Sequence, residues 1–579
     1  MKLVIVGGVA GGASAAARAR RLSEDAEIIL FERGEYVSFA NCGLPYYAGD
    51  VIKKKKRLLV QTPEGLRKRF NIDVRIKSEV ISIDREAKLV TVRDYEKKKE
   101  YQETYDCLIL SPGAEPIRLS FEGASLECVH TVRTVPDIER IKEKLDAGSV
   151  KRAVVIGAGF IGIEMAENLR ERGIETHLIE KMDQVMPPMD KEMAVILHRE
   201  LGEHDIRLHL DSEVTRITVE DDRWEVILSS ERRLTADLII MAIGVYPEIQ
   251  LARDAGLETG KKGIVTDKKM RTSDGSIFAI GDVVESEDPV TGLRRNVPLA
   301  GPAAKQALVA VNTLFGIEDE YKGTLGTSIV KVFNLTAAMT GASEKTLRAA
   351  GVSYEKVYTF PADHVGYYPG ATQMALKLLY GKDSGIVLGA QIVGRNGIAR
   401  RADILAVAVK QKMTVRDLAE LELCYAPPYG SSKDAVNLAG MTALNHIRGI
   451  TELVHWEELS GEEFLLDVRT AKEHTERNVP NSVNIPVDEI RERLPELPSD
   501  KEIIVFCHVG IRAHIACRIL SQRGYKTANI SGGYLSFLNS RDAYDSDMML
   551  AQQTRLAEGA FCTGPTGEPI DDNGDGRKK

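Results

Sequence analysis

The stretch KLVIVGGVAGGASAAARARRL, residues 2–22, decides the fold of the first part of the chain. A short apolar run passes through a glycine-rich turn into an alanine-rich helical segment, and EIILFE (27–32) follows as a second strand. Strand, helix and strand in this order form a βαβ unit, the building block of a parallel sheet. RAVVIGAGFIGIEMAENLRERG (152–173) and THLIE (176–180) repeat the pattern about 150 residues later. We therefore expect an α/β protein with two separate parallel sheets.

The size and composition of the chain narrow the class of protein. Its 579 residues exceed what one hydrophobic core can organise and suggest about four domains. A net charge of −8 gives no reason to expect nucleic acid as a partner. GGVAGG interrupts the apolar N-terminal run, so no secretion signal is expected, and no stretch approaches the roughly 18 apolar residues of a membrane span. Seven scattered cysteines suit a reducing cytoplasm better than a disulfide framework.

Glycines at the first turn point to dinucleotide binding. They allow a tight turn and let a pyrophosphate approach the free N–H groups of the following helix. Val9 replaces the middle glycine of the G-x-G-x-x-G pattern, so a glycine-rich turn without a ligand stays an alternative here. Glu32 ends the next strand, where it can accept a hydrogen bond from a ribose hydroxyl. The turn residues concerned are Gly7, Gly8, Val9, Ala10, Gly11 and Gly12.

The second turn has the complete pattern. Glu180 at the end of the following strand would repel a 2′-phosphate, so NADH is preferred, and the neighbouring Lys181 leaves NADPH possible. Two dinucleotide folds in one chain most economically hold a flavin and a nicotinamide. IFAIGD (277–282) supports the flavin, because a strand that ends in Gly281 and Asp282 can bring a carboxylate to a ribityl hydroxyl. The residues predicted at the second turn are Gly157, Gly159, Phe160, Ile161, Gly162 and Glu164.

Six motifs, taken in their order along the chain, carry a family resemblance. GGVAGG, SFANCGLPY, GAGFIGIE, IFAIGD, HVGYYPG and YAPPYGSSKD follow one another between residue 1 and about residue 445. This order resembles the coenzyme A-disulfide reductase branch of the flavin-dependent pyridine nucleotide-disulfide oxidoreductases, which also includes CoA-persulfide reductases and NADH oxidases. The resemblance implies FAD and NAD(P)H as cofactors, CoA as substrate or bound thiol, and an α+β dimerisation domain. It adds cofactor contacts at Arg33, Ser111, Pro112, Gly113, Gly244, Pro298 and Ala300.

Cys42 is the candidate redox group of this part of the chain. It has no close cysteine partner in the sequence, because the next one is Cys107. If Cys42 is redox-active, its partner is external: a sulfenic oxygen, a persulfide sulfur or a bound thiol. A buried and inert thiol is the alternative. The resemblance implies a mixed disulfide between Cys42 and CoA.

The resemblance also implies residues around the bound CoA and across a homodimer. Tyr367 and Tyr425 match paired tyrosines that reach the cysteine from the other subunit, where a phenol can donate a proton to a thiolate. Phe70 stands where relatives have a basic residue, which leaves one phosphate contact open. For each basic residue a solvated helix face remains the alternative. The residues that match the CoA site are Arg18, Arg21, Ser38, Asn41 and Lys433.

A second chemical site lies near the C-terminus. In IIVFCHVGIRAHIACRIL (503–520) a strand ends at Cys507, and the loop to Arg512 would curl round the sulfur. Backbone N–H groups and a helix N-terminus aimed at the sulfur lower a thiol pKa and stabilise a persulfide anion. With LLDVRT and SVNIP upstream, residues 450–541 resemble a rhodanese domain. A phosphatase-like loop is the alternative, although its motif is C-x5-R and C-x4-R stands here.

These interpretations divide the chain and suggest its activity. We expect an NAD(P)H-dependent flavoprotein that reduces CoA persulfide, polysulfide and CoA disulfide through Cys42, with the rhodanese domain handling sulfane sulfur. An NADH oxidase that reduces oxygen or peroxide through a Cys42 sulfenic acid is the alternative, and a slow FAD-binding redox sensor is another. No metal site is expected. The expected parts are an FAD-binding domain (1–112 and 250–325), an NAD(P)H-binding domain (113–249), a dimerisation domain (326–445), a rhodanese domain (450–541) and a disordered tail (542–579) with an unexplained Cys562.

Overall fold

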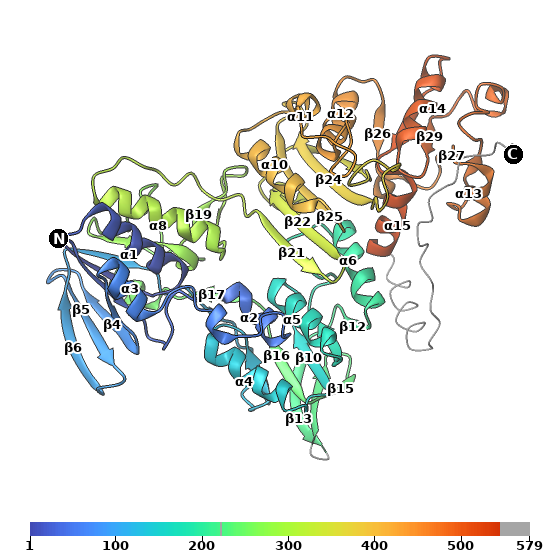
Figure 1. Cartoon of the computed structure of the whole chain (residues 1–579). Coiled ribbons are helices and arrows are strands. Elements are labelled where there is room, and N and C mark those ends of the chain that lie inside the picture. Colours follow the sequence, from blue (N-terminus) through green and yellow to red (C-terminus); the bar gives the residue numbers. More distant parts are fainter. Residues whose placement is uncertain (221–222, 545–579) are drawn as a thin grey trace, which may run out of the picture.

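The computed structural model describes residues 1–220 and 223–544 (Figure 1). Within these residues no helix is both long enough and apolar enough to cross a membrane. Most of the expected tail, with Cys562, lies outside the described residues. Helix α15 (Gly533–Tyr544) includes residues 542–544, where the tail was expected to begin.

The first parallel sheet forms round the strand that opens the chain. Its order is β18-β7-β1-β2-β3, with every neighbouring pair parallel. Ala15, Ala16 and Ala19 of helix α1 are fully buried, and the helix packs beside α8 (Figure 1). The carboxyl ends of β1, β2, β7 and β18 share one edge, so the turns that follow them meet there. The elements are β1 (Lys2–Val6), β2 (Glu27–Phe31), β3 (Asp73–Arg75), β7 (Cys107–Leu110), β18 (Ile277–Ala279), α1 (Ala10–Leu22) and α8 (Ala300–Leu314), with a separate antiparallel sheet of β4 (Ser78–Asp84), β5 (Leu89–Asp94) and β6 (Lys99–Thr104).

The second parallel sheet repeats this design round the second glycine turn. Its order is β12-β11-β10-β16-β9, again all parallel. Helix α4 begins with a capping box, in which the side chains of Thr134 and Asp137 satisfy each other's backbone N–H groups. The elements are β9 (Val129–Thr131), β10 (Arg152–Ile156), β11 (Glu175–Ile179), β12 (Ile206–His209), β16 (Leu238–Met241), α4 (Val135–Asp146), α5 (Phe160–Glu171) and α6 (Lys191–Glu203), with a small sheet of β13 (Val214–Glu220), β14 (Arg223–Leu228) and β15 (Arg233–Ala236).

An antiparallel sheet follows, of order β21-β22-β25-β24-β23. All residues of its strand β24 are buried, including Lys377, because helices cover one face and other domains the second. This sheet with its helices confirms the expected α+β domain. The elements are β21 (Ser328–Val332), β22 (Leu335–Gly341), β23 (Tyr354–Thr359), β24 (Met374–Gly381), β25 (Val387–Gly394), α9 (Glu344–Ala349), α10 (Ile398–Lys410), α11 (Val415–Glu420) and α12 (Ala435–Ile447).

The C-terminal part is a small parallel sheet of order β26-β30-β29-β27-β28 with helices round it. Strand β29 ends directly before Cys507, and α14 begins four residues after that cysteine. The two Rossmann-like sheets, the α+β domain and this small α/β domain confirm the fold class expected from the sequence. The elements are β26 (Glu452–Val454), β27 (Phe464–Asp467), β28 (Val483–Asn484), β29 (Ile503–Phe506), β30 (Thr527–Ile530), α13 (Ala471–Glu476), α14 (Ile511–Ser521) and α15.

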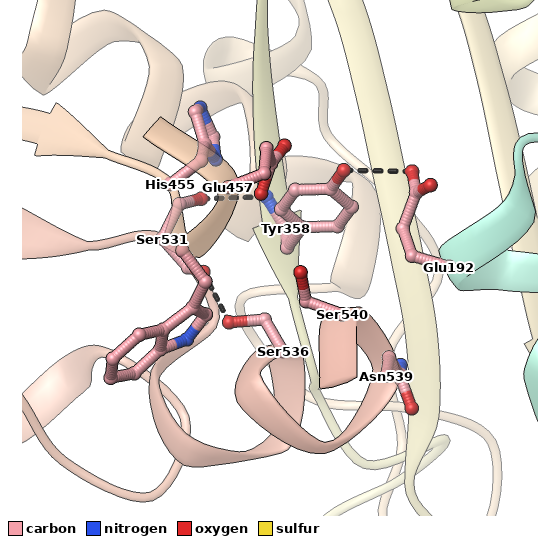
Figure 2. A pocket seen from close by; sticks show the side chains of 9 residues that line it. Glu192, Tyr358, His455, Glu457, Ser531, Ser536, Asn539 and Ser540 are labelled. Atoms are coloured by element: carbon pink, nitrogen blue, oxygen red, sulfur yellow. Dashed lines mark hydrogen bonds between the residues drawn. The ribbon is translucent and has the colours of Figure 1, made fainter. Parts of the chain in front are cut away.

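The C-terminal domain packs against both the antiparallel sheet and the second parallel-sheet domain. Helix α15 lies beside α6 (Figure 1), and Arg199 of α6 pairs with Asp542 of α15 at 3.0 Å. Figure 2 shows Tyr358 of β23 between the domains: its hydroxyl donates to Glu192 at 2.8 Å, and its backbone N–H donates to Ser531 Oγ at 2.8 Å. The side chains drawn there line a small cavity at this junction. The two chemical sites thus sit on one connected body.

Candidate active sites

The first glycine turn has the geometry of a phosphate-binding turn. Gly7 has φ +95°, and a Cβ there would lie 2.0 Å from the carbonyl oxygen of Ser111. A Cβ at Gly12 would lie 1.8 Å from the carbonyl oxygen of Gly7, so the helix approaches the turn at a distance that only glycine allows. Val9 has φ −95°, outside the left-handed region that favours glycine. The turn therefore does not need a glycine at this position for a positive φ.

The second glycine turn leaves open space in front of its helix. Gly159, which corresponds to Val9, has φ −78°, and a Cβ built there would meet no atom within 4 Å. A Cβ at Gly162 would lie 1.8 Å from the Gly157 carbonyl oxygen, as at the first turn. The open space and the free N–H groups of α5, which includes Phe160 and Ile161, fit a dinucleotide pyrophosphate.

The acidic strand ends hold the two turns in the same way. Glu32 accepts from the backbone N–H groups of Gly8 at 2.9 Å and Gly34 at 2.8 Å, one on each carboxylate oxygen. Glu180 accepts from those of Ala158 at 2.8 Å and Met182 at 2.9 Å. Each oxygen keeps a second lone pair, so each carboxylate is fixed beside its turn and still able to accept from a ribose hydroxyl.

The predicted flavin contacts gather at the carboxyl edge of the first sheet. Gly281, with φ +81°, donates its N–H to Gln306 at 2.7 Å and opens the turn that carries Asp282. Burial raises the pKa of the Asp282 carboxyl, and Arg133 opposes the shift. Pro112 follows Ser111, Pro298 lies two residues before α8, and Ala300 is the first residue of α8. The cradle formed by Gly7, Gly11, Ser111 and Gly281 fits a flavin dinucleotide.

Arg133 is a site residue that the sequence reasoning missed. With the Asn41 amide oriented so that both its atoms are satisfied, its oxygen accepts from Arg133 Nη1 at 2.6 Å. A Cβ at Gly113 would lie 2.7 Å from Arg133 Nη2. Arg133 therefore joins the segment that carries Cys42 to the edge of the first sheet. No motif surrounds it in the sequence, so no signal could have found it.

Two predicted cofactor residues have other partners or places. Arg33 pairs with Glu115 and, at 2.8 Å, with Glu248. Gly244, with φ +116°, accepts at its carbonyl from the Ile117 N–H at 3.0 Å in the link between the two sheets. The ion pairs of Arg33 direct its guanidinium to protein carboxylates, and its contact with a cofactor stays a prediction.

Cys42 lies in a short 3-10 turn, Asn41–Gly43, and is exposed. Neighbouring protein desolvates its thiol and raises its pKa, and the carboxylates of Glu164 and Asp282 raise it further. Tyr46, one helical turn on, donates to Glu164 Oε1 at 3.2 Å. Burial raises the pKa of Glu164 to about 7. Groups from both parallel-sheet domains thus converge on the cysteine.

The predicted CoA residues are spread round this region. Ser38, with φ +47°, donates its N–H to the Gly8 carbonyl at 2.8 Å, which fixes the start of the Cys42 segment to the first turn. Arg18 donates to Asn312 at 2.8 Å and 3.1 Å, while Arg21 and Lys433 are exposed. The Phe70 carbonyl accepts from the buried Arg20, so this position serves the fold. The contacts of these basic residues with CoA stay predictions.

Tyr367 and Tyr425 meet on the surface of the α+β domain. Their hydroxyl oxygens are 3.0 Å apart, although Tyr367 is 75% exposed and Tyr425 47% exposed. The hydrogen bond to Tyr425 raises the pKa of Tyr367. The two loops that carry them are joined by the Val365 N–H, which donates to the Gly430 carbonyl at 3.1 Å. The pair is pre-formed and faces outward.

A buried arginine holds both tyrosine loops. Arg401 is 1% exposed and donates from Nη2 to Asp434 at 2.7 Å and to the Asp363 carbonyl at 2.8 Å. Asp434 caps helix α12 on one side of this pair, and Asp363 accepts from Thr372 N–H at 2.6 Å across the base of the loop that carries Tyr367. The ion pair of Arg401 with Asp434 and its hydrogen bond to the Asp363 carbonyl therefore hold the bases of both loops together.

The C-terminal cysteine lies at the bottom of its loop. Cys507 is 1% exposed, and the Gly510 N–H points at its sulfur with an N–Sγ distance of 3.1 Å. Gly510 has φ +98°, which turns this N–H inward. The Tyr534 N–H donates to the Cys507 carbonyl at 2.7 Å, and Arg512 interacts with both Cys507 and Glu473. The loop curls round the sulfur as the sequence predicts, and the role of Arg512 stays a prediction.

Two glycine turns on two parallel sheets, with a lone exposed cysteine beside them, describe a flavoprotein reductase that takes electrons from a nicotinamide. The chain belongs to the pyridine nucleotide-disulphide oxidoreductase family, whose profile matches residues 1–307. The dimerisation domain of the same family matches residues 327–435, and a rhodanese-like domain matches residues 452–540. Members of the family use FAD and NAD(P)H.

Three relatives cover most of the chain. A coenzyme A disulfide reductase of Staphylococcus aureus is 36% identical over 444 residues, which is 76% of this chain and 99% of that one. The crystal structure of reduced Bacillus anthracis CoADR-RHD superimposes with a TM-score of 0.91 at 47% identity and covers 93% of this chain and 98% of its own. An NAD-dependent persulfide reductase from A. fulgidus gives a TM-score of 0.87 at 38% identity, with 93% of this chain and 100% of its own covered.

Proposed function

We propose that this chain is an NAD(P)H-dependent flavoprotein that reduces CoA persulfide, polysulfide and CoA disulfide through Cys42, while its rhodanese domain handles sulfane sulfur. The observation that carries the proposal is the presence, in one chain, of an exposed lone cysteine beside a dinucleotide site and a second cysteine under a sulfur-binding loop. The names of the relatives, CoA disulfide reductase and persulfide reductase, support it.

The proposed chemistry uses one intermediate for both substrates. The Cys42 thiolate attacks the sulfur that bears the CoA arm, so a Cys42–S–S–CoA bond forms and either hydrosulfide or a CoA thiolate leaves. Bound FAD and NADH would supply the electron pair that splits this disulfide into two thiolates. The role we assign to Tyr367 and Tyr425 is to protonate the leaving sulfur.

Three features support the proposed oligomeric state, nicotinamide cofactor and cellular compartment of the enzyme. The outward-facing tyrosine pair and the match to a dimerisation domain support a homodimer in which each subunit completes the other's site. Glu180 at the second turn supports NADH, and Lys181 is paired with Glu213 at 3.1 Å. The six cysteines of the described residues are free thiols, which supports a reducing cytoplasm.

Oxygen reduction through a Cys42 sulfenic acid is the weaker alternative. It gives no role to a sulfur-binding loop round Cys507 in the same chain. It also leaves unexplained the relatives named for CoA and persulfide substrates.

The test is an anaerobic NADH assay with CoA persulfide, with sulfide and CoA measured separately. Wild-type protein is expected to release one sulfide for each NADH oxidised, and Cys42→Ser none. Acid digestion of the non-reduced protein is expected to yield a CoA adduct on the Cys42 peptide that dithiothreitol removes. Rapid oxygen consumption without CoA, together with a bare Cys42, would overturn the proposal.

A further inference from the structure

The charged arginine of the sulfur-binding loop is already paired with a carboxylate. Arg512 donates from Nη1 and Nη2 to the two carboxylate oxygens of Glu473, both at 2.7 Å. Such a two-pronged pair is among the strongest that side chains form. These hydrogen bonds lower the pKa of Glu473 to about 2, so the carboxylate is ionised at neutral pH. An incoming anion at this loop therefore meets an ion pair and no free guanidinium of Arg512.

The other cations near the loop are balanced in the same way. Arg469 pairs with Asp467 at 2.7 Å, and both are buried. His474 Nδ1 lies 2.9 Å from the same carboxylate of Asp467. Burial lowers the pKa of His508, the residue after Cys507, so its imidazole is neutral at pH 7. Among the described residues that pack against the loop, these carboxylates offset the arginine charges.

The loop can still hold one negative charge on sulfur. The Gly510 N–H lies 3.1 Å from Cys507 Sγ, and α14, with 11 residues, begins at the next position. A backbone N–H and a helix N-terminus suit a single anion. Thiosulfate brings a second charge on a sulfonate bonded directly to the transferred sulfur. Because Cys507 is 1% exposed, that charge would have to leave water without an unpaired cation to meet it.

From this arrangement we infer that the rhodanese-like site draws its sulfur from persulfides carried on thiols, discriminates against thiosulfate, and owes this preference to Glu473. A thiol persulfide puts an uncharged alkyl arm beside the transferred sulfur, and any charge on its carrier lies far from Cys507. The inference rests on the proposed function, because it names the donor for the domain assigned there to sulfane sulfur.

The transfer step balances without an outside oxidant or reductant. The Cys507 thiolate attacks the terminal sulfur of R–S–SH. The new Cys507–S bond forms as the bond to the R–S sulfur breaks, and the products are Cys507–S–SH and the thiolate R–S⁻. Cyanide then removes the terminal sulfur as thiocyanate and leaves a proton and the Cys507 thiolate. Thiosulfate transfers its outer sulfur to Cys507 in the same way, with sulfite as the leaving group. Thiocyanate formation therefore measures both donors in one assay.

The first test uses the full-length wild-type protein with cyanide as acceptor and glutathione persulfide or thiosulfate as donor. We expect kcat/KM for the persulfide to exceed that for thiosulfate by about tenfold or more. Cys507→Ser provides the blank for both donors. Equal values, or a preference for thiosulfate, would overturn the inference with no variant needed.

The second test removes the carboxylate that masks Arg512. Glutamine at position 473 keeps the capping box with Thr470, because glutamine serves that role as glutamate does. Glu473→Gln is expected to raise kcat/KM for thiosulfate relative to persulfide by about tenfold. Glu476→Gln removes the same charge from the same helix, at an exposed residue that contacts Lys472 at 3.9 Å, and should leave the ratio unchanged. Equal donor ratios in the two variants would also overturn the inference.

The two proposals fail separately. If NADH-dependent sulfide release from CoA persulfide is absent while the donor preference in the cyanide assay holds, the proposed function fails and the inference about Glu473 stands. If sulfide release is normal while thiosulfate is the better donor, the inference fails alone. NADH-dependent reduction of CoA disulfide by Glu473→Gln checks that the rest of the chain is intact.

Discussion

Lys377 and Asp190 form an ion pair of 2.7 Å between two domains, although Lys377 is fully buried and Asp190 nearly so. The same ammonium contacts Glu192 and, at 2.5 Å, Glu344. Lys356 joins Glu344 at 2.9 Å to Glu457 of the rhodanese domain at 2.6 Å. The cluster therefore ties three domains together, with Tyr358 bonded to Glu192 at its edge (Figure 2).

Lys377→Met should destabilise the protein strongly. The substitution leaves the carboxylates of Asp190, Glu192 and Glu344 buried close together without the ammonium that balances them, and breaking a buried pair in this way costs about 3–5 kcal/mol. Thermal unfolding of the FAD-loaded protein measures the loss. Lys382→Met is the matched control. Lys382 directly follows β24, its side chain is exposed, and its ion pair with Glu355 at 2.9 Å lies at the surface. Equal shifts in the two variants would contradict this account of the cluster.

The two surface tyrosines should act as a unit. Tyr367→Phe and Tyr425→Phe each remove the shared hydrogen bond, so each is expected to lower kcat for CoA disulfide about 100-fold, within the range of general acid catalysis. The double variant should lose little more, because residues that share one interaction are not additive. Steady-state kinetics with NADH measure this. Tyr429→Phe, on the same loop and 70% exposed, should keep full activity, and additive losses would argue against a shared role.

The sequence predicted the elements and the local turns well, because their signals are local. Val9 departs from the glycine pattern of the first turn and so weakened the prediction of a dinucleotide site. In the structure this position has a negative φ and carries valine. Such a judgement needs the backbone angle, which the glycine pattern does not contain.

Contacts between distant segments were outside the reach of the sequence. Arg133 reaches Asn41 and Gly113 only because two sheets meet at their edges. The ion-pair partners of Arg33, Glu115 and Glu248, come from much later in the chain. Lys377 gave one signal, a lysine inside an apolar strand, and its three acidic partners lie on segments that the sequence pattern could not bring together.

Glu164 should set the pH at which Cys42 becomes reactive. Desolvation raises the pKa of the Cys42 thiol first, and the Glu164 carboxylate adds to the shift, so Glu164→Gln should lower that pKa. The rate of Cys42 alkylation by iodoacetamide, followed against pH by peptide mass, is expected to rise at lower pH in the variant. Glu171→Gln, at an exposed position on the same helix, should leave the profile in place. An unchanged profile in Glu164→Gln would rule out this electrostatic link.

The same carboxyl should make stability depend on pH. Burial raises the pKa of Glu164 from 4.5 to about 7, so its contribution to stability is full below pH 4.5 and is lost as the pH rises through about 7. Wild-type protein should therefore lose up to about 3 kcal/mol relative to Glu164→Gln between pH 4.5 and pH 8. Urea midpoints of both proteins at the two pH values test this. A difference between the proteins that stays constant with pH would contradict it.

Gly532 should control how tightly the rhodanese domain docks. It has φ +77°, and a Cβ there would lie 2.8 Å from the Phe360 ring and 2.9 Å from the Tyr358 and Ser536 side chains. Gly532→Ala must therefore push the domain away from β23 and weaken the neighbouring hydrogen bond from the Tyr358 N–H to Ser531 Oγ. Hydrogen exchange of the peptide containing residues 354–360 should become faster.

Gly524→Ala separates this steric effect from backbone strain. Gly524 has φ +89°, so alanine is strained there too, but a Cβ at this position meets no atom within 4 Å. Both variants should lose similar stability within the rhodanese domain, and only Gly532→Ala should accelerate exchange in β23. If the two variants accelerate hydrogen exchange of that peptide equally, exchange in β23 follows the stability of the rhodanese domain. Direct contact at Gly532 then does not protect the strand. If only Gly532→Ala accelerates exchange there, the close packing of the rhodanese domain on β23 depends on the absence of a side chain at Gly532.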